Sequence, residues 1–312
     1  MNERGVRNLF DVIIVGAGPA GLAAGIYSAF FGVDTLVLES GKQAGGRMLM
    51  ARKIVNYPGF PEKITGRELA SRMARQAEDA GAQVHTSEEV VNLSCKNEVR
   101  VETSRDVYRS KALILATGAG MKGLGLEGET WFGDGISYCS ECNATMIDGR
   151  DIIVIGNARR MVDETICLSK IASHLLLVNH ANTVSTGTRE KDELRRNGVE
   201  LVKDFVGEAI KGKPPHVQLV LRSMKNHGTK KLTASILCVV SPPVPFVSVL
   251  QKAGIATHRA SCIEADMFGR TNIEGVFAAG SCALTTKDII PSCIGDGTTV
   301  AAQACLYVKN KT

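Results

Sequence analysis

Residues 10–21 read FDVIIVGAGPAG, an apolar run followed at once by the glycine pattern GxGxxG. This pattern, placed after a strand and at the start of a helix, is typical of dinucleotide-binding βαβ units. Gly16 permits the tight turn, Gly18 lets the backbone approach a pyrophosphate, and Gly21 allows close packing of the helix on the strand. The stretch therefore predicts a dinucleotide site in preference to a purely structural turn.

The strand that follows completes the unit. Residues 35–38 (TLVL) are apolar and end at Glu39, whose carboxylate is suited to accept hydrogen bonds from ribose hydroxyls. The pattern then recurs, with a strand at 151–156, a helix from about 159 to 171 and a strand at 174–178. Gly156 follows Gly16 by 140 residues. The sequence therefore contains an internal duplication.

Further elements lie between and after the two copies. Thr65, with Glu68 three residues later, predicts a capping box and a helix to about Gly81, followed by short strands to Arg109 and a strand at 112–120. The PPVP run at 242–245 ends the second unit, and the tail regains a strand at 275–280 and a helix from about 295. The chain is long enough for two domains. Because the tail regains a strand and a helix after the second unit has ended, the first domain is expected to be discontinuous.

The second glycine pattern departs from the first where the chemistry needs it, reading Gly156-Asn157-Ala158-Arg159-Arg160-Met161. Ala158 adds a methyl group where a pyrophosphate would approach, and Met161 puts a long side chain at the helix-packing position. The next strand ends in Asn179-His180-Ala181, which offers neither an acid for a ribose nor arginines for a 2′-phosphate. Ordinary NADPH binding is not expected here.

The composition excludes several classes of protein. Apolar residues make up 44% and charged residues 22%, as in an ordinary globular α/β protein. The net charge of +5 is spread along the chain, which argues against nucleic acid as a partner. The first strand begins too early for a signal peptide and no apolar run reaches about 18 residues, so a cytoplasmic protein without membrane spans is expected. Nine cysteines include Cys95, Cys167 and Cys238 in apolar stretches, where buried thiols are expected.

Two cysteines stand apart from the rest, in Cys139-Ser140-Glu141-Cys142. CxxC spacing across a helix start brings two sulfurs within disulfide reach, and a helix N-terminus favours the thiolate. A zinc site would need two more ligands, yet the sequence has no second CxxC and no clustered histidine pair. The pair therefore predicts redox chemistry.

Six motifs occur in a specific order: GAGPAG (16–21), AGGRM (44–48), VNYPGF (55–60), LATG (115–118), ISYCSEC (136–142) and TNIEGVFAAG (271–280). Together they resemble the low-molecular-weight thioredoxin reductase family over nearly the whole chain. The resemblance implies an α/β fold with two Rossmann-like (FAD/NAD(P)-binding, three-layer ββα) domains in a duplicated disulfide-reductase arrangement. The FAD-binding domain would be 1–116 plus 243–312, and the NAD(P)-binding-like domain carrying the CxxC would be 117–242.

The resemblance also implies roles for residues. Cys142 would exchange electrons with the flavin, and Cys139 would attack the disulfide of a thioredoxin-like partner. A homodimer is expected on the same basis. The residues expected to contact FAD are Gly16, Gly18, Pro19, Ala20, Gly21, Glu39, Gly46, Arg47, Asn56, Val91, Thr117, Gly118, Gly280, Ser281 and Ile290.

The chain departs from the family at informative positions. The acid that follows the CxxC in the family is Asn143 here, so Glu141 or water would have to move the proton. The Gly-Asp contact to the flavin ribityl chain reads Gly280-Ser281, a weaker neutral hydrogen bond. The altered NADPH residues resemble the branch that is reduced by ferredoxin, a deazaflavin coenzyme or another flavin.

The favoured hypothesis is a disulfide reductase in which such a donor reduces FAD, FAD reduces the CxxC, and the dithiol reduces a thioredoxin-like protein. Arg159 and Arg160 would then be available to dock an acidic electron carrier such as ferredoxin. Two alternatives stay open. One is a small-molecule dithiol oxidase that passes electrons to oxygen, and the other is a non-enzymatic flavin redox sensor.

Overall fold

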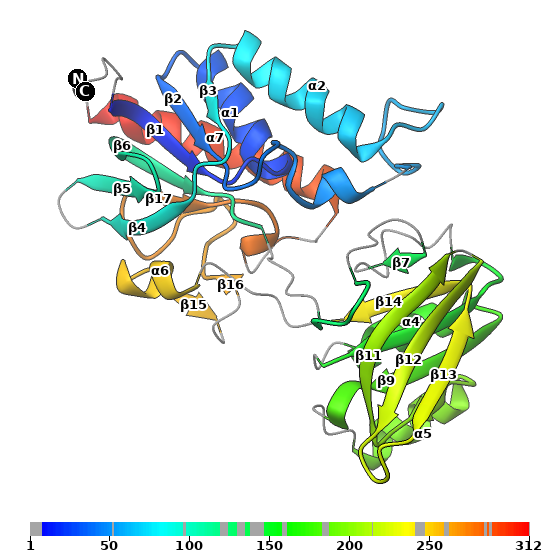
Figure 1. Cartoon of the computed structure of the whole chain (residues 1–312). Coiled ribbons are helices and arrows are strands. Elements are labelled where there is room, and N and C mark those ends of the chain that lie inside the picture. The colour runs from blue at the N-terminus through cyan, green and yellow to red at the C-terminus, as the bar shows by residue number, and fades with distance from the viewer. Residues whose placement is uncertain are drawn as a thin grey trace. The chain divides into compact units, whose positions relative to one another are not determined.

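The computed structural model divides into two compact units, Met1–Gly120 with Val244–Thr312 and Met121–Pro243 (Figure 1). The predicted domain ranges differ from these bounds by a few residues, and the ligand assigned to each domain stays a prediction. The structure describes residues 8–51, 53–95, 98–118, 124–129, 135–137, 147–157, 161–182, 187–213, 215–240, 247–258, 262–283, 286 and 289–311.

The first unit is built on one sheet with the strand order β3-β2-β1-β6-β5-β4, in which β17 also pairs with β6. Its strands are β1 (Leu9–Val15), β2 (Thr35–Leu38), β3 (Gln83–His85), β4 (Val90–Ser94), β5 (Val99–Thr103), β6 (Val107–Leu115) and β17 (Val276–Ala278). Strand β6 is parallel to β1 along most of its length. It pairs antiparallel with β5 at its start and parallel with β17 at its end. The tail of the chain thereby joins the N-terminal sheet.

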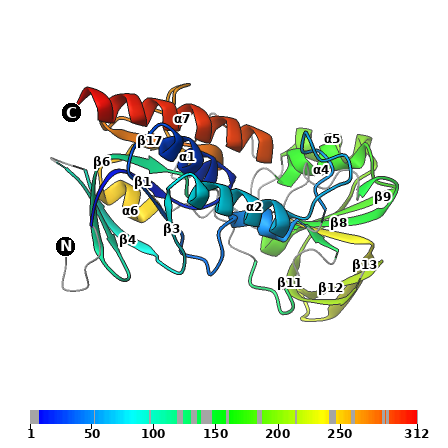
Figure 2. The same ribbon diagram turned by 90° about the horizontal axis from the view of Figure 1, so that it is seen from above.

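Both faces of this sheet are covered. Val12 and Ile14 of β1 pack into a core with the helices α1 (Pro19–Phe30), α2 (Gly66–Asp79) and α7 (Ile290–Asn310), and Figure 2 shows these helices from above. Ile13 and Val15 point to the opposite face and pack with residues of β4, β5 and α6 (Val247–Lys252). The alternation follows from the two-residue period of a strand. Short elements complete the unit: η1 (Gly46–Met50), β15 (Thr257–His258), β16 (Cys262–Ile263) and η4 (Gly280–Cys282).

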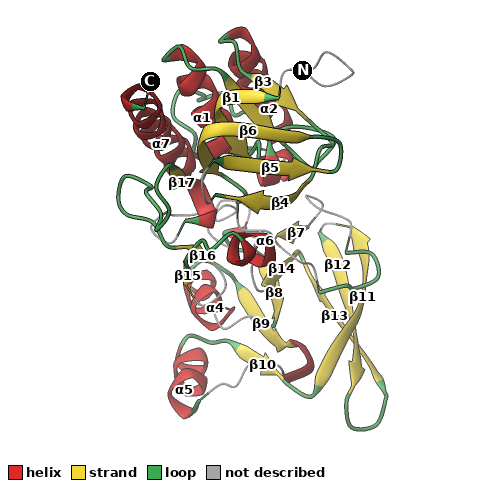
Figure 3. Ribbon diagram, turned by 90° about the vertical axis from the view of Figure 1, so that its left-hand side faces the viewer, coloured by secondary structure: helices red, strands yellow, loops and turns green. Residues whose placement is uncertain are grey.

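The second unit has a parallel sheet, a three-stranded antiparallel sheet and helices, which Figure 3 shows by element type. The parallel sheet has the order β10-β9-β8-β14-β7, from β7 (Ile136–Ser137), β8 (Asp151–Gly156), β9 (His174–Asn179), β10 (Glu200–Val202) and β14 (Ile236–Val240). The antiparallel sheet contains β11 (Phe205–Lys213), β12 (His216–Ser223) and β13 (Thr229–Ala234). The helices are α4 (Met161–Ser169) and α5 (Thr188–Arg196), with the turn η3 (His180–Asn182) after β9.

Two apolar clusters hold the second unit together. One fills the space between the two sheets and includes Ile153 and Leu219, and the other lies between the parallel sheet and the helices and includes Val154 and Leu168. The second unit is therefore a three-layer ββα structure. The predicted α/β fold with two Rossmann-like domains is confirmed.

Local expectations can be compared with the elements. Thr65 caps α2 as predicted, with its hydroxyl accepting from the Glu68 N–H at 3.1 Å, but the Glu68 carboxylate pairs with Arg72. Strand β6 runs unbroken across the boundary expected at Arg109. One of its edges pairs with β1 throughout this region, while the other edge pairs first with β5 and then with β17. Helix α7 begins at Ile290 and not near 295, since a proline fits the first turn of a helix.

One expectation about the thiols is wrong. Cys167 is exposed on α4, because Thr165 and Leu168 occupy the buried face of that helix. Cys238 is buried as expected, and Cys95 is half-buried. Among the helices that the structure describes, none combines the length and apolar character needed to cross a bilayer.

Candidate functional site

The turn after β1 has the shape that a pyrophosphate site requires. Gly16 has φ +102°, and a Cβ there would lie 2.4 Å from the carbonyl oxygen of Ala116. A Cβ on Gly21 would lie 1.7 Å from the Gly16 oxygen, whereas a Cβ on Gly18 would meet nothing within 4 Å. The turn is thus packed against protein on one side and open at Gly18, where α1 begins. Pro19 occupies the first turn of that helix, which contains no acidic residue, so its N-terminus fits an anionic diphosphate.

Glu39 follows β2 and lies at the edge of this turn. Its Oε2 accepts from the Ala17 N–H at 2.9 Å, and its Oε1 accepts from the Gly41 N–H at 2.8 Å. These two bonds hold the carboxylate beside the glycine loop. The arrangement fits the predicted contact with a ribose.

Two further segments converge on the loop from distant parts of the chain. Gly46, at the start of η1, has φ +53°, and a Cβ there would lie 3.2 Å from the Gly18 Cα. The next residue, Arg47, donates from Nη2 to the Ser281 hydroxyl at 3.3 Å. A Cβ on Gly118 would lie 3.9 Å from the same Ser281 oxygen. The end of β6, η1 and η4 therefore meet at one place.

The floor of this region is tightly packed. Gly280 has φ +75°, and a Cβ there would lie 2.7 Å from the buried Ala20 methyl, so Ala20 supports the loop from beneath. The Cys282 thiol donates to the Leu115 carbonyl at 3.2 Å and also contacts Thr117. Burial raises the pKa of Cys282, so this thiol stays neutral. Ile290 begins α7 and packs against the core of the unit.

Two further residues, Asn56 and Val91, were also predicted to contact the cofactor. Asn56 is exposed between the bridged residues Ile54 and Ile64, and Val91 on β4 is 48% exposed. Within the described parts of the chain, no hydrogen bond joins either side chain to the glycine loop. Their role at the cofactor stays a prediction.

The predicted redox pair, Cys139 and Cys142, lies outside the residues that the structure describes, as does Asn143. The described chain before the pair ends with β7, whose Ser137 pairs with Cys238 of β14. The roles of the two cysteines stay predictions.

The described residues on either side of the corresponding turn in the second unit differ from those of the first unit. Gly156 is extended and belongs to β8, so the left-handed conformation of Gly16 is not repeated. Met161 takes the position of Gly21 and is fully buried, and its Cβ lies 3.2 Å from where a Cβ on Gly156 would stand. Ala158, Arg159 and Arg160 fall outside the described residues.

The carboxyl end of β9 is also tied into the protein. Asn179 is buried, and His180 Nδ1 accepts from the Gly207 N–H of β11 at 3.1 Å. Burial lowers the pKa of His180, while Glu129 acts in the opposite direction. Ala181 and Asn182 both have left-handed φ values, of 53° and 52°. This end of the sheet therefore offers no acidic residue at the position that Glu39 holds in the first unit.

One buried carboxylate was not singled out from the sequence. Glu88 is 2% exposed, and its backbone N–H donates to the Glu39 carbonyl in the first unit. Its sequence context, Ser87-Glu88-Glu89, reads as an ordinary solvated turn. No sequence signal distinguishes Glu88 from Glu89, because only the tertiary packing buries the first of them.

Comparisons with known proteins agree with the geometry. The family model described as "Pyridine nucleotide-disulphide oxidoreductase" matches residues 10–304. The chain is 31% identical over 302 residues to a thioredoxin reductase of Treponema pallidum, covering 96% of this chain and 97% of that protein. It is similar to the crystal structure of thioredoxin reductase from Streptococcus pyogenes, with TM-score 0.88, 26% identity and coverage of 98% and 100%. The thioredoxin reductase of Giardia duodenalis gives TM-score 0.87, 26% identity and coverage of 97% and 100%.

Proposed function

Because this chain belongs to the pyridine nucleotide-disulphide oxidoreductase family, we propose that it reduces a protein disulfide with electrons from a donor other than NADPH. It is a flavoprotein disulfide reductase of the thioredoxin reductase type, and its cofactor is FAD. When bound, FAD supplies two-electron transfer between a donor and a disulfide. The glycine loop, Glu39, Arg47 and Ser281 are the groups that we assign to holding it.

The observation that carries the choice of donor is the contrast between Gly21 in the first unit and Met161 at the corresponding position of the second. In the first unit a Cβ at Gly21 would lie 1.7 Å from the Gly16 oxygen, so only glycine is compatible with that turn. The second unit has buried Met161 at this place, and Gly156 remains in its strand. A turn of the first kind cannot form around a methionine. This supports the loss of pyrophosphate binding, and with it the loss of NADPH as an ordinary donor.

We assign the disulfide chemistry to Cys139 and Cys142. Two electrons and two protons convert their disulfide into a dithiol. The Cys139 thiolate then attacks a disulfide of the partner, which forms a mixed disulfide and releases one partner thiol. Cys142 attacks the Cys139 sulfur, which releases the second partner thiol and restores the Cys139–Cys142 disulfide. The partner we propose is a thioredoxin-like protein, as the names of the similar reductases suggest.

The remaining features of the proposal concern the donor and the setting. We propose ferredoxin, a reduced deazaflavin coenzyme or a free reduced flavin as donor, with Arg159 and Arg160 docking an acidic carrier. We also propose a cytoplasmic homodimer. Analytical ultracentrifugation tests the dimer, since a monomer at micromolar concentration contradicts it.

Anaerobic reduction of the bound flavin, followed in the visible spectrum, tests the donor. NADPH is expected to reduce it slowly, and one of the proposed donors rapidly. The variant Met161→Gly combined with Ala158→Gly, which restores the three glycines, serves as a comparison. Reduction of the wild type by NADPH at the rate of disulfide turnover contradicts the proposal.

The same preparation separates the reductase from the rival dithiol oxidase. A reductase consumes the donor only when a disulfide substrate is present, and it uses little oxygen. An oxidase consumes oxygen when a dithiol alone is added. Oxygen uptake that exceeds disulfide reduction under matched conditions favours the oxidase.

A further inference from the structure

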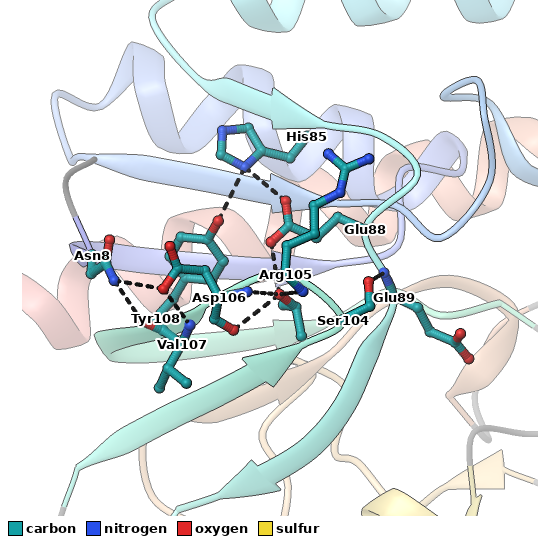
Figure 4. A network of polar contacts seen from close by, with 10 residues as sticks. Asn8, His85, Glu88, Glu89, Ser104, Arg105, Asp106, Val107 and Tyr108 are labelled. Atoms are coloured by element: carbon teal, nitrogen blue, oxygen red, sulfur yellow. Dashed lines mark hydrogen bonds and ion pairs between the residues drawn. The ribbon is translucent and has the colours of Figure 1, made fainter. Parts of the chain in front are cut away.

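The buried carboxylate of Glu88 sits between β3 and β4 at the centre of a polar network (Figure 4). Its Oε1 accepts from the Thr103 hydroxyl at 2.7 Å, and its Oε2 lies 3.2 Å from Nδ1 of His85. A buried carboxylate is costly unless hydrogen bonds compensate its lost hydration. The network supplies that compensation.

Tyr108 of β6 closes the network. Its hydroxyl lies 3.5 Å from His85 Nδ1 and also contacts Glu88. Burial, followed by the contact with Glu88, raises the pKa of Tyr108 far above its usual range, with Asp106 acting in the same direction and Arg105 against it. The phenol therefore remains protonated and available as a donor. Side chains from β3, β5 and β6 thus meet at one carboxylate.

The same residues grip the backbone of Glu39. The Glu39 N–H donates to the His85 carbonyl at 2.8 Å, and the Glu88 N–H donates to the Glu39 carbonyl at 2.9 Å. The Ser87 backbone N–H donates to the Gly41 carbonyl at 2.8 Å. Both backbone groups of Glu39 are therefore held by residues whose side chains hold each other.

We propose that Glu88 is a positioning residue for the cofactor, since it fixes the 85–88 turn and thereby the Glu39 carboxylate, which we assign to the adenosine ribose. The inference rests on the proposed FAD site. Because the Glu88 carboxylate is buried, we assign it no direct contact with FAD. Its effect passes through the backbone of Glu39, whose carboxylate is placed by that backbone and by Ala17.

The experiment measures the rate at which FAD leaves the full-length holoenzyme, by recovery of flavin fluorescence. Glu88→Gln keeps the size of the side chain but removes its charge, and we expect it to raise the release rate by about tenfold. Tyr108→Phe, a milder change that deletes one hydroxyl, is expected to raise it by about threefold. Glu89→Gln is the matched control. The Glu89 carboxylate is next to Glu88 in the sequence but is exposed, so this substitution should leave the release rate unchanged.

A second control separates positioning from loss of stability. Ser110 of β6 makes a buried hydrogen bond to the Ala112 carbonyl at 2.7 Å, outside the 85–88 turn. Ser110→Ala should lower the melting temperature without changing FAD release. If Glu88→Gln and Tyr108→Phe release FAD no faster than Ser110→Ala, the network is merely structural and the inference is wrong. If Glu39→Gln leaves FAD release unchanged, the assigned ribose contact is wrong instead.

Discussion

Arg47 donates a hydrogen bond to the Ser281 hydroxyl across 234 residues of sequence, at 3.3 Å. It joins η1, just after the first βαβ unit, to η4 at the end of β17. Position 281 therefore offers the Arg47 guanidinium a neutral hydroxyl and not a carboxylate. We therefore expect position 281 to set the strength of cofactor binding.

Substitutions at Ser281 test this expectation. Ser281→Ala removes the hydroxyl and should weaken FAD binding a few-fold, by about 1 kcal/mol. Ser281→Asp provides a charged acceptor, and charge-assisted hydrogen bonds are stronger, so it should tighten binding. The dissociation constant of FAD is measured by fluorescence titration, with Ser173→Ala in the second unit as the control, because it removes an exposed hydroxyl that bonds only to Asp151 among the described residues. Equal constants in all four proteins would exclude a role for this residue.

Gly18 offers a test of the loop itself. A Cβ on Gly18 meets no protein atom within 4 Å, so Gly18→Ala should leave the fold intact, at a cost of about 1 kcal/mol or less for the helix cap. The methyl group would stand where the diphosphate approaches, and FAD affinity should fall by more than about tenfold. Gly187→Ala is the matched control, because Gly187 also precedes a helix in an open position. An unchanged FAD affinity in Gly18→Ala contradicts the proposed site.

The two cysteines of the CxxC are expected to differ. Cys142→Ser should trap a stable mixed disulfide between Cys139 and the partner, because the resolving thiolate is absent. Cys139→Ser should leave the Cys142 thiolate beside the flavin and give a long-wavelength absorption band. Both variants should bind FAD and lose disulfide turnover. Wild-type turnover in either one would show that the pair is structural.

The remaining thiols should react according to burial. Cys167 is exposed, whereas burial, followed by the charge of Glu164, raises the pKa of Cys238 to about 12. Because the thiolate is the reactive form, iodoacetamide at mildly alkaline pH should modify Cys167 at least about tenfold faster than Cys238. Peptide mass spectrometry measures both rates in one sample. Cys238 should react only after unfolding, and equal rates under native conditions would contradict the packing of β14.

The raised pKa of Cys238 also predicts a pH dependence of stability. The folded state favours the neutral thiol, so the contribution of Cys238 is fully present below its ordinary pKa of 9.0 and is lost as the pH rises towards about 12. Cys95 and Tyr108 act in the same direction. The free energy of unfolding should therefore fall less steeply over this range in Cys238→Val than in the wild type. Parallel curves for the two proteins would refute the assignment.

Much of the fold follows from local patterns in the sequence. The apolar runs that became β1, β2, β8 and β9 and the glycine turn of the first unit have strong signatures, since strand burial and turn geometry restrict residue type directly. The cap at Thr65 is equally local. The resemblance named Gly46, Arg47 and Ser281 as cofactor contacts; the structure brings them together, while their contact with FAD stays a prediction.

Other features depend on tertiary pairing and could not be predicted in this way. The length of β6 depends on β5 and β17, and the burial of Glu88 but not Glu89 depends on Thr103 and Tyr108. The exposure of Cys167 depends on which face of α4 meets the sheet. The first two features are decided by residues outside the local segment, and the periodicity within a segment does not identify those residues.

Two contacts of the first unit affect the order in which it can fold during synthesis. Strand β17 pairs with β6, and helix α7 packs in the same apolar core as α1. Both elements come from the last part of the chain, after the whole of the contiguous second unit. On the ribosome the second unit can thus complete its core first. Until β17 and α7 emerge, the nascent N-terminal sheet lacks the partner of the end of β6, at Leu113–Leu115, and the apolar side of α1 is uncovered. Vectorial synthesis therefore postpones a finished flavin cradle until the C-terminal helix has emerged.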